Sequence, residues 1–128
     1  MKIAIIGSRE FNDYSLLEET MTELSTTNFP PTHIVSGGAK GADTLGEKWA
    51  NENNIETIIF LPDWSKYGKQ AGFIRNVDII KNSDFIVAFW DGESKGTLHS
   101  INLTEKQNKP IKIINYEKTK NTQRVQTK

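Results

Sequence analysis

The chain has 128 residues, and its 16 lysine and arginine side chains balance 16 aspartate and glutamate side chains, so the formal net charge at pH 7 is zero. Such a chain has no overall field that would draw it to nucleic acid or to an anionic membrane, and binding of nucleic acid would need a local basic patch. It has no cysteine, which excludes thiol catalysis, disulfide bonds and zinc sites with cysteine ligands.

Five apolar runs predict five β-strands, and periodic apolar residues between them predict helices. The first and fourth runs are almost wholly apolar, which is typical of strands buried on both faces. Strict alternation with short loops predicts one Rossmann-like α/β domain of three layers, in which helices cover a five-stranded parallel sheet. The predicted strands are residues 2–7, 32–36, 56–61, 85–90 and 111–114, and the helices follow Asp13, occupy about 42–53, end near Asn82 and include Leu98 and Ile101.

The two ends of the chain carry further expectations. The first strand begins directly after Met1 with no basic leader, and no apolar run approaches the roughly 20 residues of a membrane-spanning helix, so we expect a cytoplasmic protein without a membrane partner. Residues 1–116 form the predicted domain. The polar residues 117–128 lack periodicity and are expected to form a mobile tail.

A glycine-rich loop, Ser36-Gly37-Gly38-Ala39-Lys40-Gly41-Ala42-Asp43, joins the second strand to the second helix. Glycines allow positive φ and close backbone approach, so several N–H groups could point at one anion beside the positive end of a helix. We interpret the loop as a phosphate cradle, with a simple tight turn as the alternative. It matches neither the P-loop pattern nor the Gly-x-Gly-x-x-Gly pattern of dinucleotide-binding proteins.

Two other loops carry unusual polar residues. Gly7-Ser8-Arg9-Glu10 follows the first strand, and Asp91-Gly92-Glu93-Ser94-Lys95-Gly96-Thr97 follows the fourth. Ligands of open α/β sheets bind beyond the carboxyl ends of the strands, where the strand order reverses. The three loops become neighbours if the order is 3-2-1-4-5, so we predict that order.

Several of these residues have a structural alternative. Ser94 suits an anion site but also the N-cap of a helix, and Arg75, next to Asn76, suits phosphate or a solvated helix face. Asp43 either stabilises the first helical turn through the helix dipole or accepts bonds from ribose hydroxyls. Trp64 and Tyr67 either stack on a base or pack over the sheet edge.

The chain resembles the SLOG superfamily, named from the Smf/DprA proteins and the LOG enzymes, and within it the YspA-type branch of bacteria and phages. The resemblance rests on Ile-Ile-Gly-Ser-Arg-Glu-Phe, on Ile-Val-Ser-Gly-Gly-Ala-Lys-Gly-Ala-Asp, on Ser-Lys-Gly-Thr, and on the Trp-x-x-Tyr-Gly-Lys-x-Ala-Gly-x-x-Arg-Asn stretch from Trp64 to Asn76. It covers about residues 2–115 and implies a Rossmann-like fold that binds a nucleotide-derived ligand.

Together, the motifs and the resemblance give one set of candidate ligand-binding residues. We predict no metal site, because His33 and His99 lack the spacing of metal ligands, and no cofactor; catalytic residues are unknown. The candidates are Gly7, Ser8, Arg9, Glu10, Ser36, Gly37, Gly38, Ala39, Lys40, Gly41, Asp43, Arg75, Asn76, Gly92, Ser94, Lys95, Gly96 and Thr97.

Three functions remain open. The first is binding, as a sensing or sequestering module, of a mononucleotide or an ADP-ribose-like molecule. The second is nucleotide hydrolysis as in the related phosphoribohydrolases, but Ser100 stands where their catalytic glutamate would be, and Glu10, Asp43 or Asp91 would have to replace it. The third is single-stranded DNA binding, as in the DprA branch, with Lys40, Lys66, Lys69, Arg75 and Lys95 as a basic rim. A homodimer is also considered.

Overall fold

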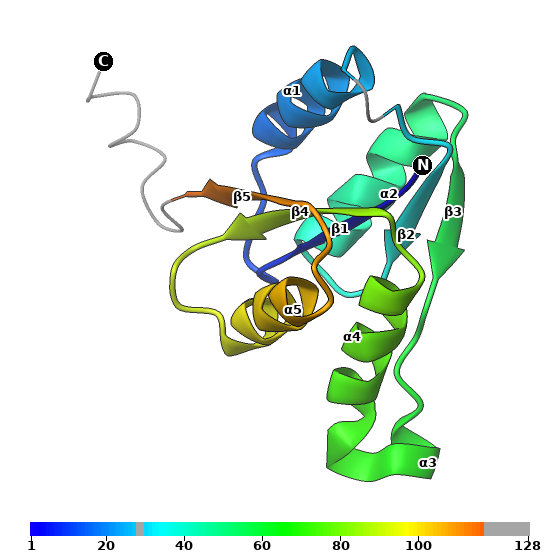
Figure 1. Ribbon diagram of the computed structural model, residues 1–128, viewed down its shortest axis with the longest axis vertical. Helices are drawn as coiled ribbons and strands as arrows, with labels where there is room; N and C mark the ends of the chain where they lie inside the picture. Colours follow the sequence, from blue (N-terminus) through cyan, green and yellow to red (C-terminus); the bar gives the residue numbers. More distant parts are fainter. Residues whose placement is uncertain (28–29, 117–128) are drawn as a thin grey trace.

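A computed structural model describes residues 1–27 and 30–116, so the predicted tail at 117–128 lies outside the described residues. Its centre is a five-stranded parallel sheet with the order β3-β2-β1-β4-β5 (Figure 1), which confirms the predicted fold class and the predicted strand order. The strands are β1 (Lys2–Gly7), β2 (His33–Ser36), β3 (Glu56–Ile59), β4 (Phe85–Trp90) and β5 (Ile111–Asn115).

The two central strands explain why the sheet is buried on both faces. Along β1, Ile3 and Ile5 pack with one hydrophobic cluster, and Ala4 and Ile6 pack with the other. This alternation follows from the two-residue repeat of a strand, which sends successive side chains to opposite faces. Successive residues of β1 and β4 therefore pack against opposite helical layers, and every second residue packs against the same one.

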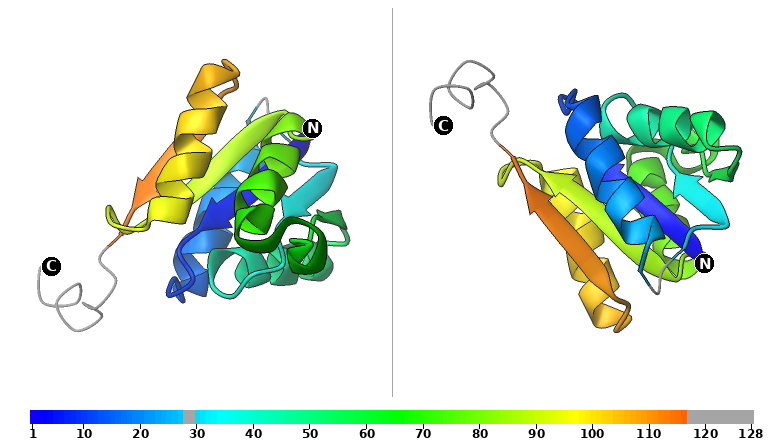
Figure 2. Two further views of the ribbon diagram at one scale, coloured as in Figure 1. Left: turned by 90° about the horizontal axis from the view of Figure 1, so that it is seen from below. Right: turned by 90° about the horizontal axis from the view of Figure 1, so that it is seen from above.

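The helices form two layers on opposite faces of the sheet (Figure 2). α1 (Tyr14–Ser25) and α2 (Ala42–Glu52) cover the face of Ile3 and Ile5, and α4 (Ala71–Lys81) and α5 (Lys95–Lys106) cover the other. The Asp13 carboxylate accepts a hydrogen bond from the Leu16 N–H at 3.0 Å and so caps α1. None of the helices within 1–27 and 30–116 is long and apolar enough to cross a membrane.

The connection after β3 differs from the sequence prediction. β3 ends at Ile59 instead of Leu61, and a one-turn helix α3 (Trp64–Tyr67) and a 3-10 turn η1 (Gly68–Gln70) precede α4. The Asp63 carboxylate caps α3 by accepting the Lys66 N–H at 3.1 Å. Because α3 and η1 contain no buried residue, they leave no apolar repeat in the sequence that would predict a helix.

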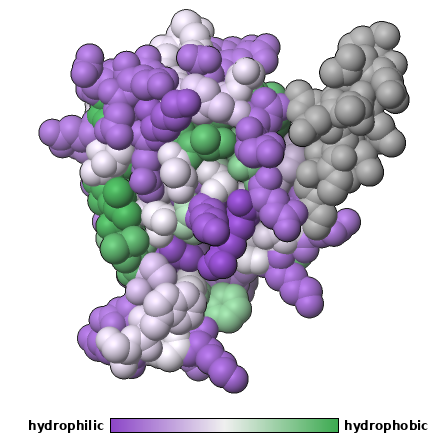
Figure 3. Space-filling view, turned by 180° about the vertical axis from the view of Figure 1, so that it is seen from behind, coloured by the Kyte–Doolittle hydropathy of each residue, from purple (hydrophilic) through white to green (hydrophobic). Residues whose placement is uncertain are grey.

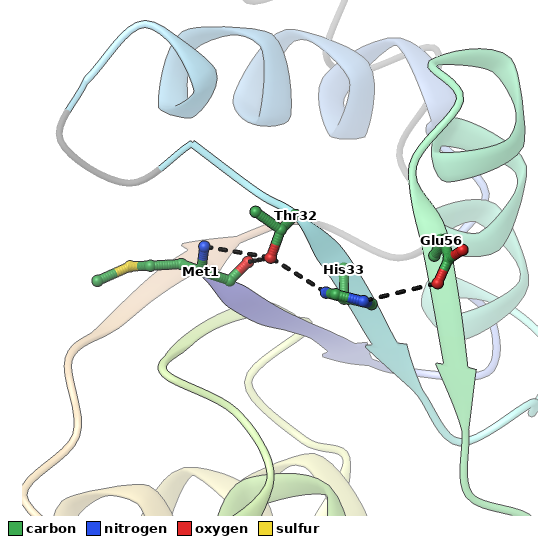
Figure 4. A network of polar contacts seen from close by, with 4 residues as sticks. All are labelled: Met1, Thr32, His33 and Glu56. Carbon is green, nitrogen blue, oxygen red and sulfur yellow. Dashed lines mark hydrogen bonds and ion pairs between the residues drawn. The ribbon is translucent and has the colours of Figure 1, made fainter.

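The amino ends of the strands are tied together by paired polar groups (Figure 4). The Thr32 hydroxyl lies 3.3 Å from the Met1 amino nitrogen, donates to the Met1 carbonyl at 3.1 Å and lies 3.1 Å from His33 Nδ1. The other ring nitrogen of His33 lies 3.6 Å from Glu56 on β3. We call Met1, Thr32, His33 and Glu56 the amino-edge network.

Candidate ligand-binding site

A cleft of about 540 Å³ opens at the carboxyl edge of the sheet. The loops after β1 and β4 and the glycine loop after β2 line it together with α3, η1 and α4. This is the place where the strand order reverses between β1 and β4, which is where open α/β sheets bind ligands. Seen from behind (Figure 3), strongly hydrophilic residues gather at the centre of the face above the projecting α3 segment.

The structure brings most, but not all, of the predicted residues to this cleft. Those that line it are Gly7, Ser8, Arg9, Glu10, Ala39, Asp43, Arg75, Asn76, Ser94, Gly96 and Thr97. Those that do not line it are Ser36, Gly37, Gly38, Lys40, Gly41, Gly92 and Lys95. All four residues of the first loop therefore line the cleft, whereas most of the glycine loop does not.

Ser8 is the most unusual residue of the cleft. Its side chain is only 4% exposed, and its hydroxyl has no hydrogen-bond partner among residues 1–27 and 30–116. The backbone of Ser8 is fully used, because its N–H donates to the Phe89 carbonyl at 3.2 Å and its carbonyl accepts from Phe11 at 3.2 Å and Ala42 at 3.3 Å. A buried hydroxyl without a partner costs free energy, and binding of a ligand is one way to recover that cost.

The amides of the glycine loop already donate to acceptors within the chain. The N–H groups of Gly37 and Ala39 donate to Asp43 Oδ2 at 3.2 and 3.3 Å, and the Gly38 N–H donates to the Ser36 hydroxyl at 3.1 Å. The Gly37 and Ala39 amides therefore hold the carboxylate of Asp43, and the Gly38 amide serves the Ser36 hydroxyl. In this structure these three amides have acceptors within the chain instead of the expected phosphate.

Two glycines of this loop lie in close contact with other parts of the site, and at Gly41 the contacts require glycine. A Cβ at Gly37 would lie 2.6 Å from Nη1 of Arg75 and 2.9 Å from Oδ2 of Asp43, so these two side chains would have to shift. Gly41 has a φ of +84°, and a Cβ there would collide with the carbonyls of Ser8 and Arg9. Gly37 thus leaves room for the Arg75 side chain, and Gly41 leaves room for the backbone of the first loop. These contacts account for the two glycines without a bound phosphate.

Asp43 and Arg75 form the charged interior of the site. The Asp43 side chain is 7% exposed, and burial raises the pKa of Asp43 to about 6, although the Ala39 N–H, Arg75 and the Gly37 N–H all act in the opposite direction. Burial also lowers the pKa of Arg75, as does Arg9, whereas Asp43 raises it. Arg75 donates from Nη1 to the Gly37 carbonyl at 2.7 Å. Asp43 is thus a carboxylate whose protonation changes just below neutral pH.

The loop after β4 is held by its own side chains. The Asp91 carboxylate accepts the N–H groups of Glu93 and Ser94, both at 2.8 Å. The Ser94 hydroxyl lies 3.0 Å from the Thr97 hydroxyl and accepts the Thr97 N–H at 3.4 Å, which confirms its alternative role as the N-cap of α5. Ser94, Gly96 and Thr97 still line the cleft, so the first turn of α5 faces it.

The candidate list omitted nearly half of the cleft's lining. The available signals are the Trp64–Asn76 motif, which contains Trp64, Lys69, Gly72 and Phe73, and the loop after β4, which contains Asp91 and Glu93. The residues outside the candidate list are Ile6, Trp64, Lys69, Gly72, Phe73, Ile79, Asp91, Glu93 and Ser100.

The cleft carries charges of both signs. Among the described residues that line it, Arg9, Lys69 and Arg75 are cationic, and Glu10, Asp43, Asp91 and Glu93 are anionic. No group of three or more histidine, aspartate or glutamate side chains within the described part of the chain is arranged to hold a metal ion. The mixture suits a ligand with both an anionic group and hydroxyl donors.

Solved structures with the same fold include two DNA processing proteins. DprA from Streptococcus pneumoniae gives a TM-score of 0.75 at 19% identity, over 98% of this chain and 56% of that chain. DprA from Helicobacter pylori, whose structure addresses its single-stranded DNA binding mode, gives a TM-score of 0.68 at 24% identity, over 99% of this chain and 72% of that chain. The chain thus spans little more than half of the pneumococcal protein, and at these identities the likeness establishes the fold.

Sequence comparison establishes the family. The Gene 61 protein of Mycobacterium phage D29 is 30% identical over 121 residues, which cover 90% of this chain and 95% of the phage protein. The model of the YspA, cpYpsA-related SLOG family matches residues 1–67, which include the first loop and the glycine loop. The chain therefore belongs to the YspA, cpYpsA-related SLOG family.

Proposed function

We propose that the cleft binds a small phosphorylated ligand derived from a nucleotide. The observation that carries this proposal is the buried Ser8 hydroxyl, which lines the cleft without a partner next to the exposed side chain of Arg9. A donor that lacks an acceptor and a guanidinium that faces solvent are a suitable pair for a phosphate group. The volume of about 540 Å³ lies within the range of small-molecule sites.

The phosphate is assigned to the side of the cleft formed by the first loop and the first turn of α5. Gly96 and Thr97 line the cleft at that helix N-terminus, where the helix dipole favours an anion, although the Thr97 N–H already donates to the Ser94 hydroxyl. Ser8 and Arg9 would complete the contacts. This assignment replaces the glycine loop, whose amides at Gly37 and Ala39 are already used by Asp43.

The carboxylates of the cleft suit the sugar of such a ligand. Asp43 and Glu10 line the same space as Arg9, and a carboxylate is a strong acceptor for hydroxyl groups. A polyanion without free hydroxyls would be repelled by four carboxylates. A ribose phosphate offers one anionic group and hydroxyl donors, so it fits the mixed charge better.

The test is incubation of the purified protein with mononucleotides, nucleotide sugars, ADP-ribose and cyclic ADP-ribose isomers, followed by mass spectrometry of bound and converted species. We expect retention of at least one phosphorylated compound. Arg9→Ala should weaken its binding at least tenfold, which corresponds to about 1.4 kcal/mol for a charge-assisted contact. Lys40→Ala is the matched control, because Lys40 is an exposed cation of the glycine loop that does not line the cleft. Unchanged affinity in Arg9→Ala would rule out the phosphate assignment.

Hydrolysis of the nucleotide is the second candidate, and one observation favours it. All three carboxylates that could replace the glutamate of the phosphoribohydrolases, Glu10, Asp43 and Asp91, line the cleft, and so does Ser100 at the glutamate's position. An oxocarbenium-like transition state needs such a carboxylate nearby. Free base or ribose phosphate in the same incubation supports this function, and intact retained ligand argues for binding alone.

Single-stranded DNA binding is the third candidate, favoured by the fold shared with DprA. The exposed residues Lys66, Lys69 and Trp64 lie on the α3–η1 segment. There the bases of single-stranded DNA would stack on Trp64, and the two lysines would contact its phosphates. Arg75 is not part of such a rim, since its guanidinium turns inward to the Gly37 carbonyl. A steep loss of affinity with rising salt would identify this mode, and a shallow one would exclude it.

A further inference from the structure

Two aromatic side chains stand exposed along the cleft. Trp64 and Phe73 are each 54% exposed, and both line the cleft. Tyr67 lies on the same helical segment as Trp64 and is 41% exposed, but it does not line the cleft. Exposed aromatic rings leave a large apolar area in water, so two of them at one cleft wall suggest a ligand that covers them.

Each of the two rings contacts a neighbouring residue. Phe73 meets the His99 ring of α5 edge to face, with a centroid distance of 4.6 Å. His99 in turn lies 3.4 Å from the side-chain amide of Asn76, which fixes the histidine against α4. Trp64 packs over Gly72, where an added Cβ would lie 3.8 Å from the end of the indole. We call Trp64 and Phe73 the aromatic wall.

The aromatic wall extends from the α5 side of the cleft to the projecting α3 segment. Phe73, in the first turn of α4, contacts His99, one turn along α5 from Gly96. Trp64 belongs to α3, which projects at the bottom of Figure 1, away from the end of β1. The view from below agrees, with the loop between β4 and α5 on one side and the α3–η1 segment on the other (Figure 2). One continuous cleft therefore joins a polar side with Ser8 and Arg9 to an apolar side with the two rings.

We infer that the aromatic wall is a stacking platform for a nucleobase, so that the ligand is a nucleotide that keeps its base and not a sugar phosphate. The inference rests on the proposed function, because it extends the same cleft. A planar heterocycle presents an apolar face that covers exposed rings, and stacking tolerates different bases. Ile6 and Ile79 line the cleft as well and add an apolar floor.

The test compares nucleoside monophosphates and ADP-ribose with ribose 5-phosphate and inorganic phosphate by isothermal titration calorimetry. We expect at least one base-carrying compound to bind ten times more tightly than ribose 5-phosphate. Phe73→Ala and Trp64→Ala should each weaken that compound about five- to tenfold and leave ribose 5-phosphate unchanged. Tyr67→Ala is the matched control, an exposed aromatic on the same segment that should change neither affinity.

The outcomes separate this inference from the proposed function. Equal affinity for ribose 5-phosphate and every base-carrying compound overturns the stacking platform and leaves phosphate binding standing. The platform is also overturned if a nucleotide binds more tightly but neither Trp64→Ala nor Phe73→Ala weakens it. If no phosphorylated compound binds at all, the proposed function and the platform fail together.

Discussion

The two edges of the sheet treat similar polar side chains in opposite ways. At the amino edge, the Thr32 hydroxyl contacts Met1 and His33, and the Lys109 ammonium donates to the carbonyls of Ile80, Lys81 and Ser83 at 2.6, 3.1 and 2.8 Å. At the carboxyl edge, the Ser8 hydroxyl is buried without a partner among the described residues, whereas the buried carboxylate of Asp43 accepts the amides of Gly37 and Ala39. Paired polar groups stabilise the fold, and a buried hydroxyl without a partner costs free energy.

The glycine loop lies at the carboxyl edge, yet its polar groups are paired like those of the amino edge. Its amides are paired, as at the amino edge, but the acceptor is the carboxylate of Asp43, whose pKa burial raises to about 6. The loop therefore supports the site from within the chain, and the buried hydroxyl that has no partner among the described residues, that of Ser8, lies on the loop after β1.

The largest effect is expected for Gly41→Ala, which should destabilise the protein by about 4 kcal/mol, because φ is +84° and the new Cβ would collide with the Ser8 and Arg9 carbonyls. Gly96→Ala is the control, since nothing lies within 4 Å of a Cβ there. Chemical denaturation measures both. If the Gly41→Ala protein is as stable as the parent, the glycine loop does not pack as closely against the loop after β1 as described here.

The pH dependence of stability should reveal Asp43. The folded pKa of about 6 lies above the ordinary value of 3.8, so between these values the folded state binds more protons at Asp43 than the unfolded state, and the contribution of Asp43 to stability rises as the pH falls through this range. The contribution is roughly 3 kcal/mol at about 1.4 kcal/mol per pH unit. Denaturation of the parent and of Asp43→Asn across this range isolates it. Parallel curves for the two proteins would contradict the burial of a charged Asp43.

At the amino edge, Lys109→Met should lower the free energy of unfolding by about 1–2 kcal/mol, because three carbonyls at the end of α4 lose a cationic donor. Lys112→Met, an exposed position on β5, should change it by less than about 0.5 kcal/mol. Neither variant should alter retention of a nucleotide. Weaker retention of the nucleotide by Lys109→Met would show that the amino edge also contributes to ligand binding, which contradicts the assignment of the two edges to different roles.

Most of the fold could be predicted from the sequence, because its signals are local. β1 and β4 have the predicted bounds, since their apolar runs are bounded by polar residues. The strand order followed from which loops carry polar residues, and the sheet confirms it. The helix α3 was missed because a single exposed turn capped by Asp63 has no periodicity to detect.

The interior of the site could not be predicted, because it depends on the path of the loops in space. The positive φ angles of Gly38 and Gly41 turn the glycine loop back onto the first turn of α2, and only then does Asp43 reach the amides of Gly37 and Ala39. From the sequence, Asp43 was expected either to stabilise the first helical turn through the helix dipole or to accept bonds from ribose hydroxyls. Its role as the acceptor for the amides of the glycine loop was not expected. The missing partner of Ser8 is likewise a property of its surroundings and not of any motif.

The most direct test compares Ser8→Ala with Thr32→Val by denaturation with and without a nucleotide that the parent retains. We expect Ser8→Ala to keep or raise the free energy of unfolding by up to about 1 kcal/mol, because it removes a buried hydroxyl without a partner, and to weaken nucleotide binding at least fivefold. Thr32→Val should lose about 0.5–1 kcal/mol of stability and bind as the parent does. If Ser8→Ala is destabilised and binds nucleotide normally, Ser8 serves the fold, and the assignment of ligand binding to this edge is wrong.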